Sequence, residues 1–110
     1  YGLARLKTPE SKPQLDACAK CHARRHVIEP HQRAGDELLD HYVPTLIDAQ
    51  IYCEDGQIQP TEETFEYGSF LQSKMFRKNV RCTDCHDPHT ARLRANGNQL
   101  CAKCHTKSEQ

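Results

Sequence analysis

The stretch Cys82–Thr90 reads CTDCHDPHT and holds two cysteines and two histidines. Its first five residues have the form C-x-x-C-H, in which an imidazole directly follows a pair of closely spaced thiols. This spacing is typical of the covalent attachment of a c-type haem, whose porphyrin edge bonds both sulfurs while the histidine ligates the iron. The stretch therefore predicts a haem attached by Cys82, Cys85 and His86.

Two further copies of the pattern occur, one towards each end of the chain. Their attachment residues are Cys18, Cys21 and His22, and Cys101, Cys104 and His105. Six of the seven cysteines belong to the three copies, and Cys53 lies outside them. A lone cysteine is a buried apolar thiol, an intermolecular disulfide or a thiolate ligand, and the first is the commonest. Three copies predict three covalently attached haems c (heme c) as the cofactors.

Zinc binding and dithiol redox chemistry are the alternatives for a bare C-x-x-C pair. Fifteen residues separate Cys85 from Cys101, so the second and third copies satisfy zinc-ribbon spacing. A four-thiolate zinc site is already tetrahedral and needs no histidine after either pair. No βαβ pattern surrounds any pair, as thioredoxin-like chemistry would require. The sequence therefore favours haem.

The composition leaves little material for an ordinary hydrophobic core. Hydrophobic residues make up 36% of the chain, Trp is absent and the mean hydropathy is -0.84. Shared among three haems, 110 residues leave about 37 residues for each. Burial around the macrocycles would then replace burial between side chains. We expect one trihaem domain over residues 1–110, largely unfolded without haem.

The charge balance bears on partners and location. The formal net charge is zero, and haem propionates would add up to about six negative charges. No basic cluster with interleaved aromatic residues is present, so we expect no nucleic-acid partner. No segment approaches the roughly 18 apolar residues of a membrane span. Covalent haem attachment takes place outside the bacterial cytoplasmic membrane, so we expect an exported, periplasmic or extracellular protein whose signal has been removed before Tyr1.

Hydrophobic periodicity and helix-ending residues predict a mainly α fold of helices and loops, with the haems forming the core and little or no β-sheet. We expect a helix over Leu15–Ile28 whose motif faces inward, and two short helices within Asp36–Tyr52 because Pro44 breaks the helical pattern near Tyr42. Asp55-Gly56 and Pro60 mark a turn and linker, and a helix starts at Thr61. A helix over Gly68–Lys78 is capped by Asn79, and a last short helix follows Asn96-Gly97 and holds the third motif.

The second histidine of the opening stretch, His89, follows His86 after only Asp87 and Pro88. So short a tether cannot pass round the macrocycle edge to the opposite face of the same haem. His89 is therefore either a surface histidine or the distal ligand of a different haem. A nitrogen ligand on both faces makes the iron six-coordinate and low-spin, which suits electron transfer because little reorganises on reduction.

Three stretches together resemble the multihaem c-type cytochromes, and most closely the group whose modules are often fused to tetratricopeptide repeats. They are CTDCHDPH, GSFLQSKM over Gly68–Met75 and NQLCAKCH over Asn98–His105, and the resemblance runs from about Asp16 to His105. It implies a small, mainly α-helical multihaem cytochrome c with bis-histidine haems that passes electrons, and it places His89 at a distal-ligand position. Similar sequences read YHADGQI where this chain has a cysteine, Cys53, in place of the histidine, and no tetratricopeptide repeats follow.

The chain has more candidate distal ligands than three haems require. The histidines outside the attachment motifs are His26, His31, His41 and His89. His26 lies too close to His22 to serve the same haem. Each has the alternative role of a solvated or propionate-bonding histidine. Met75 is a further candidate, although a methionine at helical spacing beside Phe70 is more often a packing residue.

Two classes of function agree with these features. One is an electron carrier, either a soluble periplasmic shuttle or a subunit of a polymeric haem chain such as an extracellular cytochrome filament. The other is a redox-enzyme module, which would need an open haem site with a nearby acid or base. The surplus of histidines favours the carrier, so we expect no enzyme. The expected partners are redox proteins, an extracellular acceptor or further copies of the chain as a homo-oligomer or polymer.

Overall fold

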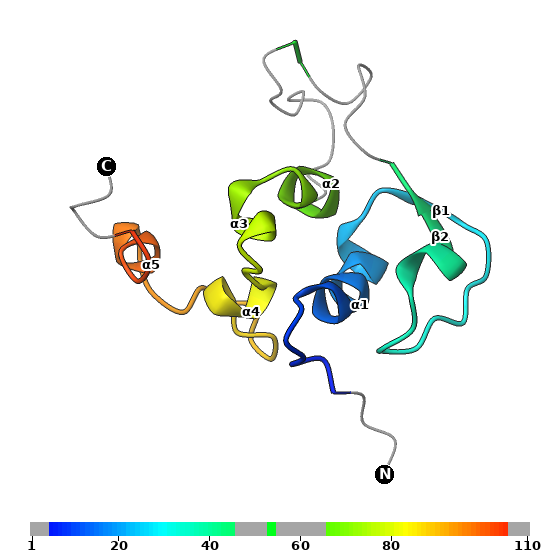
Figure 1. The fold of residues 1–110 in the computed structure, drawn as a ribbon, viewed down its shortest axis with the longest axis horizontal. Coiled ribbons are helices and arrows are strands. Elements are labelled where there is room, and N and C mark those ends of the chain that lie inside the picture. The colour runs from blue at the N-terminus through cyan, green and yellow to red at the C-terminus, as the bar shows by residue number, and fades with distance from the viewer. Residues whose placement is uncertain (1–4, 46–52, 55–65, 106–110) are drawn as a thin grey trace. The chain divides into compact units, whose positions relative to one another are not determined.

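The computed structural model describes residues 5–45, 53–54 and 66–105. It divides into two compact units, residues 1–80 and 81–110, each described by itself, and the single domain stays a prediction. Figure 1 shows the elements, most of which are helices, as expected. The first unit contains α1 (Lys12–His22), β1 (Arg25–Val27), the 3-10 helix η1 (Leu38–Asp40), β2 (Tyr42–Pro44), α2 (Glu66–Leu71) and α3 (Lys74–Arg77), and the second contains α4 (Cys82–Cys85) and α5 (Asn98–Cys101).

Helix α1 ends earlier than the sequence predicts. A proline occupies its first turn, where the missing N–H costs nothing. It stops at His22, because Ala23 is extended at φ -119° and ψ 136° while its N–H donates to the Ala19 carbonyl. The predicted extension to Ile28 is wrong. Arg25–Val27 form a strand instead, which the β-branched side chain of Val27 favours.

β1 and β2 form a two-stranded antiparallel sheet where the sequence predicts helices. Its register pairs His26 with Val43 and Val27 with Tyr42. Beyond the paired residues, the Ile28 N–H donates to the His41 carbonyl at 2.8 Å. Within Asp36–Tyr52, the described part therefore holds η1 and β2 rather than two α-helices. The prolyl residue at the end of β2 fits there because it needs to donate no ladder hydrogen bond.

The core of the first unit is small. Leu38 from η1 is fully buried and packs with Ala19, Ala23 and Tyr42, while Tyr67 from α2 packs against the cluster. The guanidinium of Arg25 lies 4.3 Å from the centroid of the Tyr42 ring, in a cation–π contact. Helices α1 and α2, the 3-10 helix and the sheet therefore meet around one leucine.

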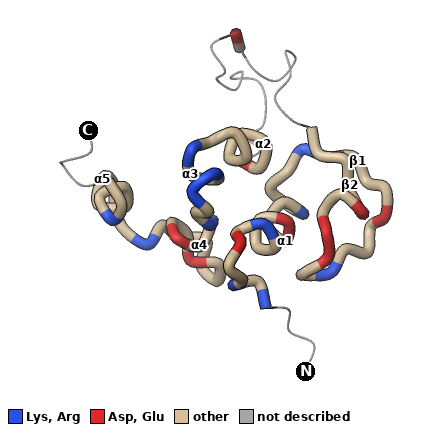
Figure 2. The backbone as a smooth tube through the Cα atoms, viewed as in Figure 1, with Lys and Arg blue, Asp and Glu red and all other residues tan. Residues whose placement is uncertain are grey.

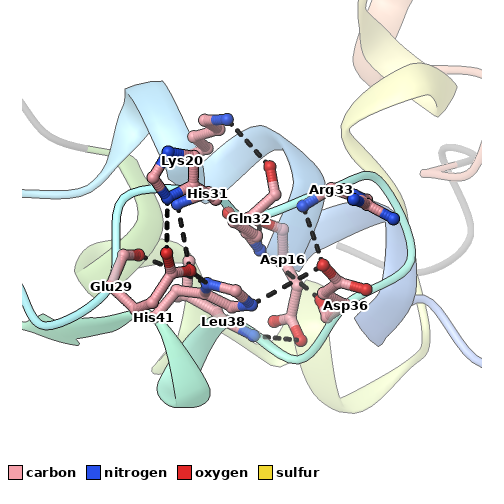
Figure 3. A network of polar contacts seen from close by, with 9 residues as sticks. All are labelled: Asp16, Lys20, Glu29, His31, Gln32, Arg33, Asp36, Leu38 and His41. Atoms are coloured by element: carbon pink, nitrogen blue, oxygen red, sulfur yellow. Dashed lines mark hydrogen bonds and ion pairs between the residues drawn. The ribbon is translucent and has the colours of Figure 1, made fainter.

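Buried polar groups connect this core to the loop between the strands. Asp16, 2% exposed, accepts from the Leu38 N–H at 3.4 Å and from Lys12 Nζ at 2.5 Å. The side-chain amide of buried Gln32 donates to the Asp16 carbonyl at 3.4 Å. Lys20 Nζ donates to the Gln32 carbonyl at 2.9 Å, as Figure 3 shows. Hydrogen bonds at Gln32 thus fasten the loop to α1 in addition to the apolar packing of Leu38.

The predicted helix over Gly68–Lys78 is two short helices. Ser73 caps α3 by accepting from the Phe76 N–H at 3.1 Å, so a new helix begins where one was expected to continue. The C-cap is Lys78, and Asn79, predicted as the cap, takes the left-handed conformation (φ 61°) at the next position. Its side chain accepts from the Ser11 N–H at 2.6 Å, which ties α3 to the start of α1.

The second unit has no buried core within its described residues, 81–105. Helix α4 is a single turn, and His86 after it is extended and forms a β-bridge with Leu93. Gly97, at φ 50°, turns the chain into α5 as predicted. None of the described residues 81–105 is buried. Packing between side chains therefore gives this unit no hydrophobic interior.

Two further findings concern all of the described residues. No helix there is long and apolar enough to cross a membrane. Figure 2 shows that acidic and basic residues are interspersed along it. The turn predicted at Asp55-Gly56, the linker at Pro60 and the helix start predicted at Thr61 lie outside the described residues.

Replacing Leu38 by Ala should lower the free energy of unfolding by about 2–4 kcal/mol, because it removes the side chain around which the first unit packs. The neighbouring Leu39 is 61% exposed and supplies the matched control. Its replacement by Ala should stay within about 0.5 kcal/mol of the parent. Urea unfolding of the holo protein, followed by far-UV circular dichroism, measures both. Equal losses for the two variants would show that Leu38 is not the centre of the core.

Candidate functional site

The first attachment motif lies on the exposed side of α1. Cys18, Cys21 and His22 are three and four residues apart and share one side of the helix. The side buried in the core carries Leu15 and Ala19 and continues to the C-cap Ala23. Cys21 and His22 are exposed and Cys18 is half-buried. The prediction that this motif faces inward is therefore wrong for the packed first unit.

The first residue of α2 orients His22. Nδ1 of His22 lies 3.2 Å from Glu66 Oε2, and both side chains are exposed. An imidazole whose Nδ1 hydrogen is held by a carboxylate offers Nε2 as its ligating nitrogen. This arrangement suits the role predicted for His22 as the proximal ligand of a haem. Sequence spacing gave no sign of Glu66, which lies 44 residues away along the chain.

The second motif occupies α4. Cys82 and Cys85 begin and end this one-turn helix, and both are half-buried. A capping box fixes the turn, in which the Arg81 N–H donates to the Asp84 carboxylate at 2.7 Å. His86 leaves the helix in an extended conformation and is exposed. The two thiols and the imidazole are therefore held by local structure.

A tight loop presents His89 behind the second motif. The Asp87 carboxylate accepts from the backbone N–H groups of His89 at 2.9 Å and Thr90 at 3.1 Å. These hydrogen bonds lower the pKa of Asp87 below its usual value. The loop closes where the Arg92 carbonyl accepts from the Asp87 N–H at 2.8 Å. His89 is exposed, and its imidazole has no hydrogen-bond partner among the described residues.

The third motif begins in α5 but extends beyond it. Cys101 is the last helical residue, and the following turn carries Cys104 and His105. The His105 N–H donates to the Cys101 carbonyl at 2.8 Å, so the turn continues helical hydrogen bonding. All three residues are exposed. The prediction of a last short helix holds, although the helix contains only the first residue of the motif.

The remaining histidines lie in the first unit. His26 is exposed in β1, so the helix on which it was expected is absent. His31 and His41 share one carboxylate, because Glu29 Oε1 lies 2.6 Å from Nδ1 of His31 and Glu29 Oε2 lies 2.6 Å from Nδ1 of His41. The hydrogen bond to His31 is the main cause that lowers the pKa of Glu29.

Two other candidate residues are exposed. Cys53 lies on the surface, so the commonest role of a lone cysteine, a buried apolar thiol, is wrong here. Met75 is 46% exposed and belongs to no buried cluster of the described residues. Neither residue is fixed by the core.

The donor set fits haem attachment better than a bound metal ion. No group of three or more His, Cys, Asp or Glu side chains in the described residues could hold a metal ion. The four thiols of the second and third motifs, all described, are thus not gathered as in a zinc ribbon. Each motif instead presents two thiols and an adjacent imidazole at or near the surface, where a porphyrin edge could reach both sulfurs.

A family model described as a doubled CXXCH motif matches residues 74–110, about a third of the chain. The matched segment contains the second and third attachment motifs. No curated protein and no solved structure matches the chain. A doubled motif of this kind indicates haem c binding and electron transfer. The match confirms the resemblance to the multihaem c-type cytochromes that the sequence predicts.

Proposed function

We propose that the protein transfers electrons through three covalently attached, mainly bis-histidine c-type haems and that it works as a subunit of a polymeric haem chain, such as an extracellular cytochrome filament. The observation that carries the proposal is the second unit. It holds two attachment motifs, yet none of its described residues is buried. Two macrocycles bound there would supply the apolar interior that its side chains do not provide.

Four histidines outside the attachment motifs are the candidates for the distal faces of the three irons: His26, His31, His41 and His89. Imidazole on both faces keeps the iron six-coordinate in both oxidation states. Little then moves on reduction, so the iron exchanges electrons rapidly. No site remains for substrate on such a haem, and the protein acts as a conductor rather than an enzyme.

Exposed apolar residues support contact with other molecules. Val27 in β1, Ile28 directly after it and Val43 in β2 are each more than half exposed. The polypeptide itself has zero net charge, so only the haem propionates, with up to about six negative charges, would repel neighbouring copies. Further copies of the chain are the partners that we propose, with a redox protein or an extracellular acceptor at the end of the path. Export to the periplasm or beyond follows from where c-type haem is attached.

The test of haem content is the intact mass of the holo protein together with a pyridine haemochrome spectrum. We expect three haems per chain, all low-spin when oxidised. A thiol-reactive maleimide should label the holo protein once, at exposed Cys53, because thioether bonds occupy the other six cysteines. The Cys53→Ser variant is the control and should not be labelled. A mass equal to that of the bare chain, or bound zinc, would refute the proposal.

Replacing His89 by Ala should leave the haem of its own motif attached and convert about a third of the haem to the high-spin state, since one of three irons loses a ligand. Electron paramagnetic resonance of the oxidised protein and carbon monoxide binding to the reduced protein report the change. Thr90→Ala, on the same exposed loop, should behave as the parent does. A parental spectrum for the His89 variant would make His89 a surface histidine.

Assembly separates the polymeric chain from the soluble shuttle. Sedimentation and electron microscopy of the holo protein at moderate salt should reveal ordered polymers. Val43→Glu should weaken them, because it places a charge on the exposed sheet. Leu39→Glu, at an exposed position in η1 (61%), is the control and should not. Monomers at high protein concentration, with and without reductant, would leave the shuttle as the function.

A further inference from the structure

One carboxylate holds two of the candidate distal ligands. Glu29 lies in the loop between the strands, and its two oxygens each lie 2.6 Å from Nδ1 of a histidine, Oε1 from His31 and Oε2 from His41 (Figure 3). The two histidines therefore share the same tautomeric constraint. They differ in what surrounds the other ring nitrogen.

His41 is enclosed by its neighbours. Its side chain is 15% exposed, and its Nε2 lies 3.6 Å from Asp36 Oδ2. The Nδ1 that faces the carboxylate also lies 3.2 Å from the Glu29 carbonyl. Both nitrogens are thus directed at protein oxygens, and an iron could bind neither until the ring left this position. The packing thus gives His41 a structural role.

His31 presents its second nitrogen to solvent. Its side chain is 85% exposed, and its Nε2 has no partner among the described residues. The backbone is fixed as well, because the His31 N–H donates to Glu29 Oε2 at 3.0 Å and the next residue, Gln32, is buried against α1. Histidines that ligate metals have this arrangement, with one ring nitrogen held by a carboxylate and the other directed outward.

The attachment motif on α1 shows the same arrangement. Nδ1 of His22, the predicted proximal ligand, lies 3.2 Å from a Glu66 oxygen, and the imidazole is exposed. His31 and Glu29 reproduce this pair in a segment without an attachment motif. An exposed imidazole oriented in this way, without thiols beside it, fits the distal face of a haem that is attached elsewhere.

We propose that His31 is a distal axial ligand of a haem iron and that Glu29 is its positioning residue. This inference rests on the proposed function and names the ligand that it left open among the histidines of the first unit. When a haem is bound, its iron would accept Nε2 of His31. The hydrogen bond from Nδ1 to the carboxylate makes the imidazole a stronger donor, which favours ferric iron and lowers the reduction potential.

The haem that His31 ligates is not the one attached to α1. The loop that carries His31 is fastened to α1 at Asp16 and Lys20. Residues two apart project to roughly opposite sides of an α-helix, so Cys18, between these two, faces away from the loop. The α1 haem must lie on that far side. The iron for His31 therefore belongs to another motif of the same chain or to a second copy of the chain.

Matched substitutions separate the two histidines. Glutamine can keep a hydrogen bond to Glu29 but is not a strong haem ligand, so His31→Gln and His41→Gln differ only in which ring is lost. We expect His31→Gln to retain three covalent haems and to make about a third of them high-spin, with added imidazole restoring the low-spin spectrum. His41→Gln should remain fully low-spin. The reverse result, or no spectral change in His31→Gln, would overturn the assignment.

The role of Glu29 is tested by charge-matched variants. Glu29→Gln should keep every haem low-spin and shift one reduction potential to a more positive value, because the imidazole loses its anionic partner. Asp36→Asn removes an equal charge beside His41 and should leave the potentials as in the parent. Equal shifts of the reduction potential in the two variants would show that Glu29 acts only through its charge and would overturn its positioning role.

Two further readouts keep the outcomes distinct. If intact mass shows no covalent haem, the proposed function fails, whereas three haems with an unaltered His31→Gln spectrum refute only the ligand assignment. Dilution of the parent protein identifies the source of the iron. A high-spin fraction that grows on dilution indicates a second copy, and a constant low-spin spectrum indicates another motif of the same chain.

Discussion

A shortage of apolar side chains constrains every other feature of this protein. Five hydrophobic residues are buried among those described, and all of them belong to the first unit. Two are alanines, so the other three supply most of the buried apolar volume: Leu15, Leu38 and Tyr42. Such a core contributes little, and a domain with so few buried apolar side chains needs cross-links or cofactors to be stable. Three attached macrocycles, each offering two large apolar faces, would supply that contribution.

Hydrogen bonds supplement the small apolar core of the first unit, and they bear on haem ligation. The loop between the strands is held by Gln32, by the buried carboxylate of Asp16 and by the link between Glu29 and its two histidines. Hydrogen bonds of this kind fix the direction of a side chain as well as its position. The loop can therefore hold an exposed imidazole such as His31 in one orientation, which hydrophobic packing of a surface residue would not do.

Local features of the structure could be predicted from the sequence, and cross-chain features could not. The turn at Gly97, the exposed loop of His89 and the left-handed residue at Asn79 follow from the backbone preferences of single residues. The strand at Arg25–Val27 was missed because its stability comes from pairing with residues 42–44. The contrast between His31 and His41 was equally hidden, because it depends on Glu29 and Asp36 and on how far the fold encloses each ring.

The two sides of α1 have separate roles in the proposed electron path. One side carries the thiols and His22 for one haem, and the other is fastened to the loop whose histidine we propose as a ligand for a different haem. A helix is about 10 Å across with its side chains. The haem attached to α1 and the haem ligated by His31 would thus lie on opposite sides of this helix. The same separation between haems would recur wherever such a histidine ligates a haem attached to another motif, within one chain or between copies. In this proposal, electrons would pass between successive haems because an imidazole from one attachment region ligates a haem that is attached to another.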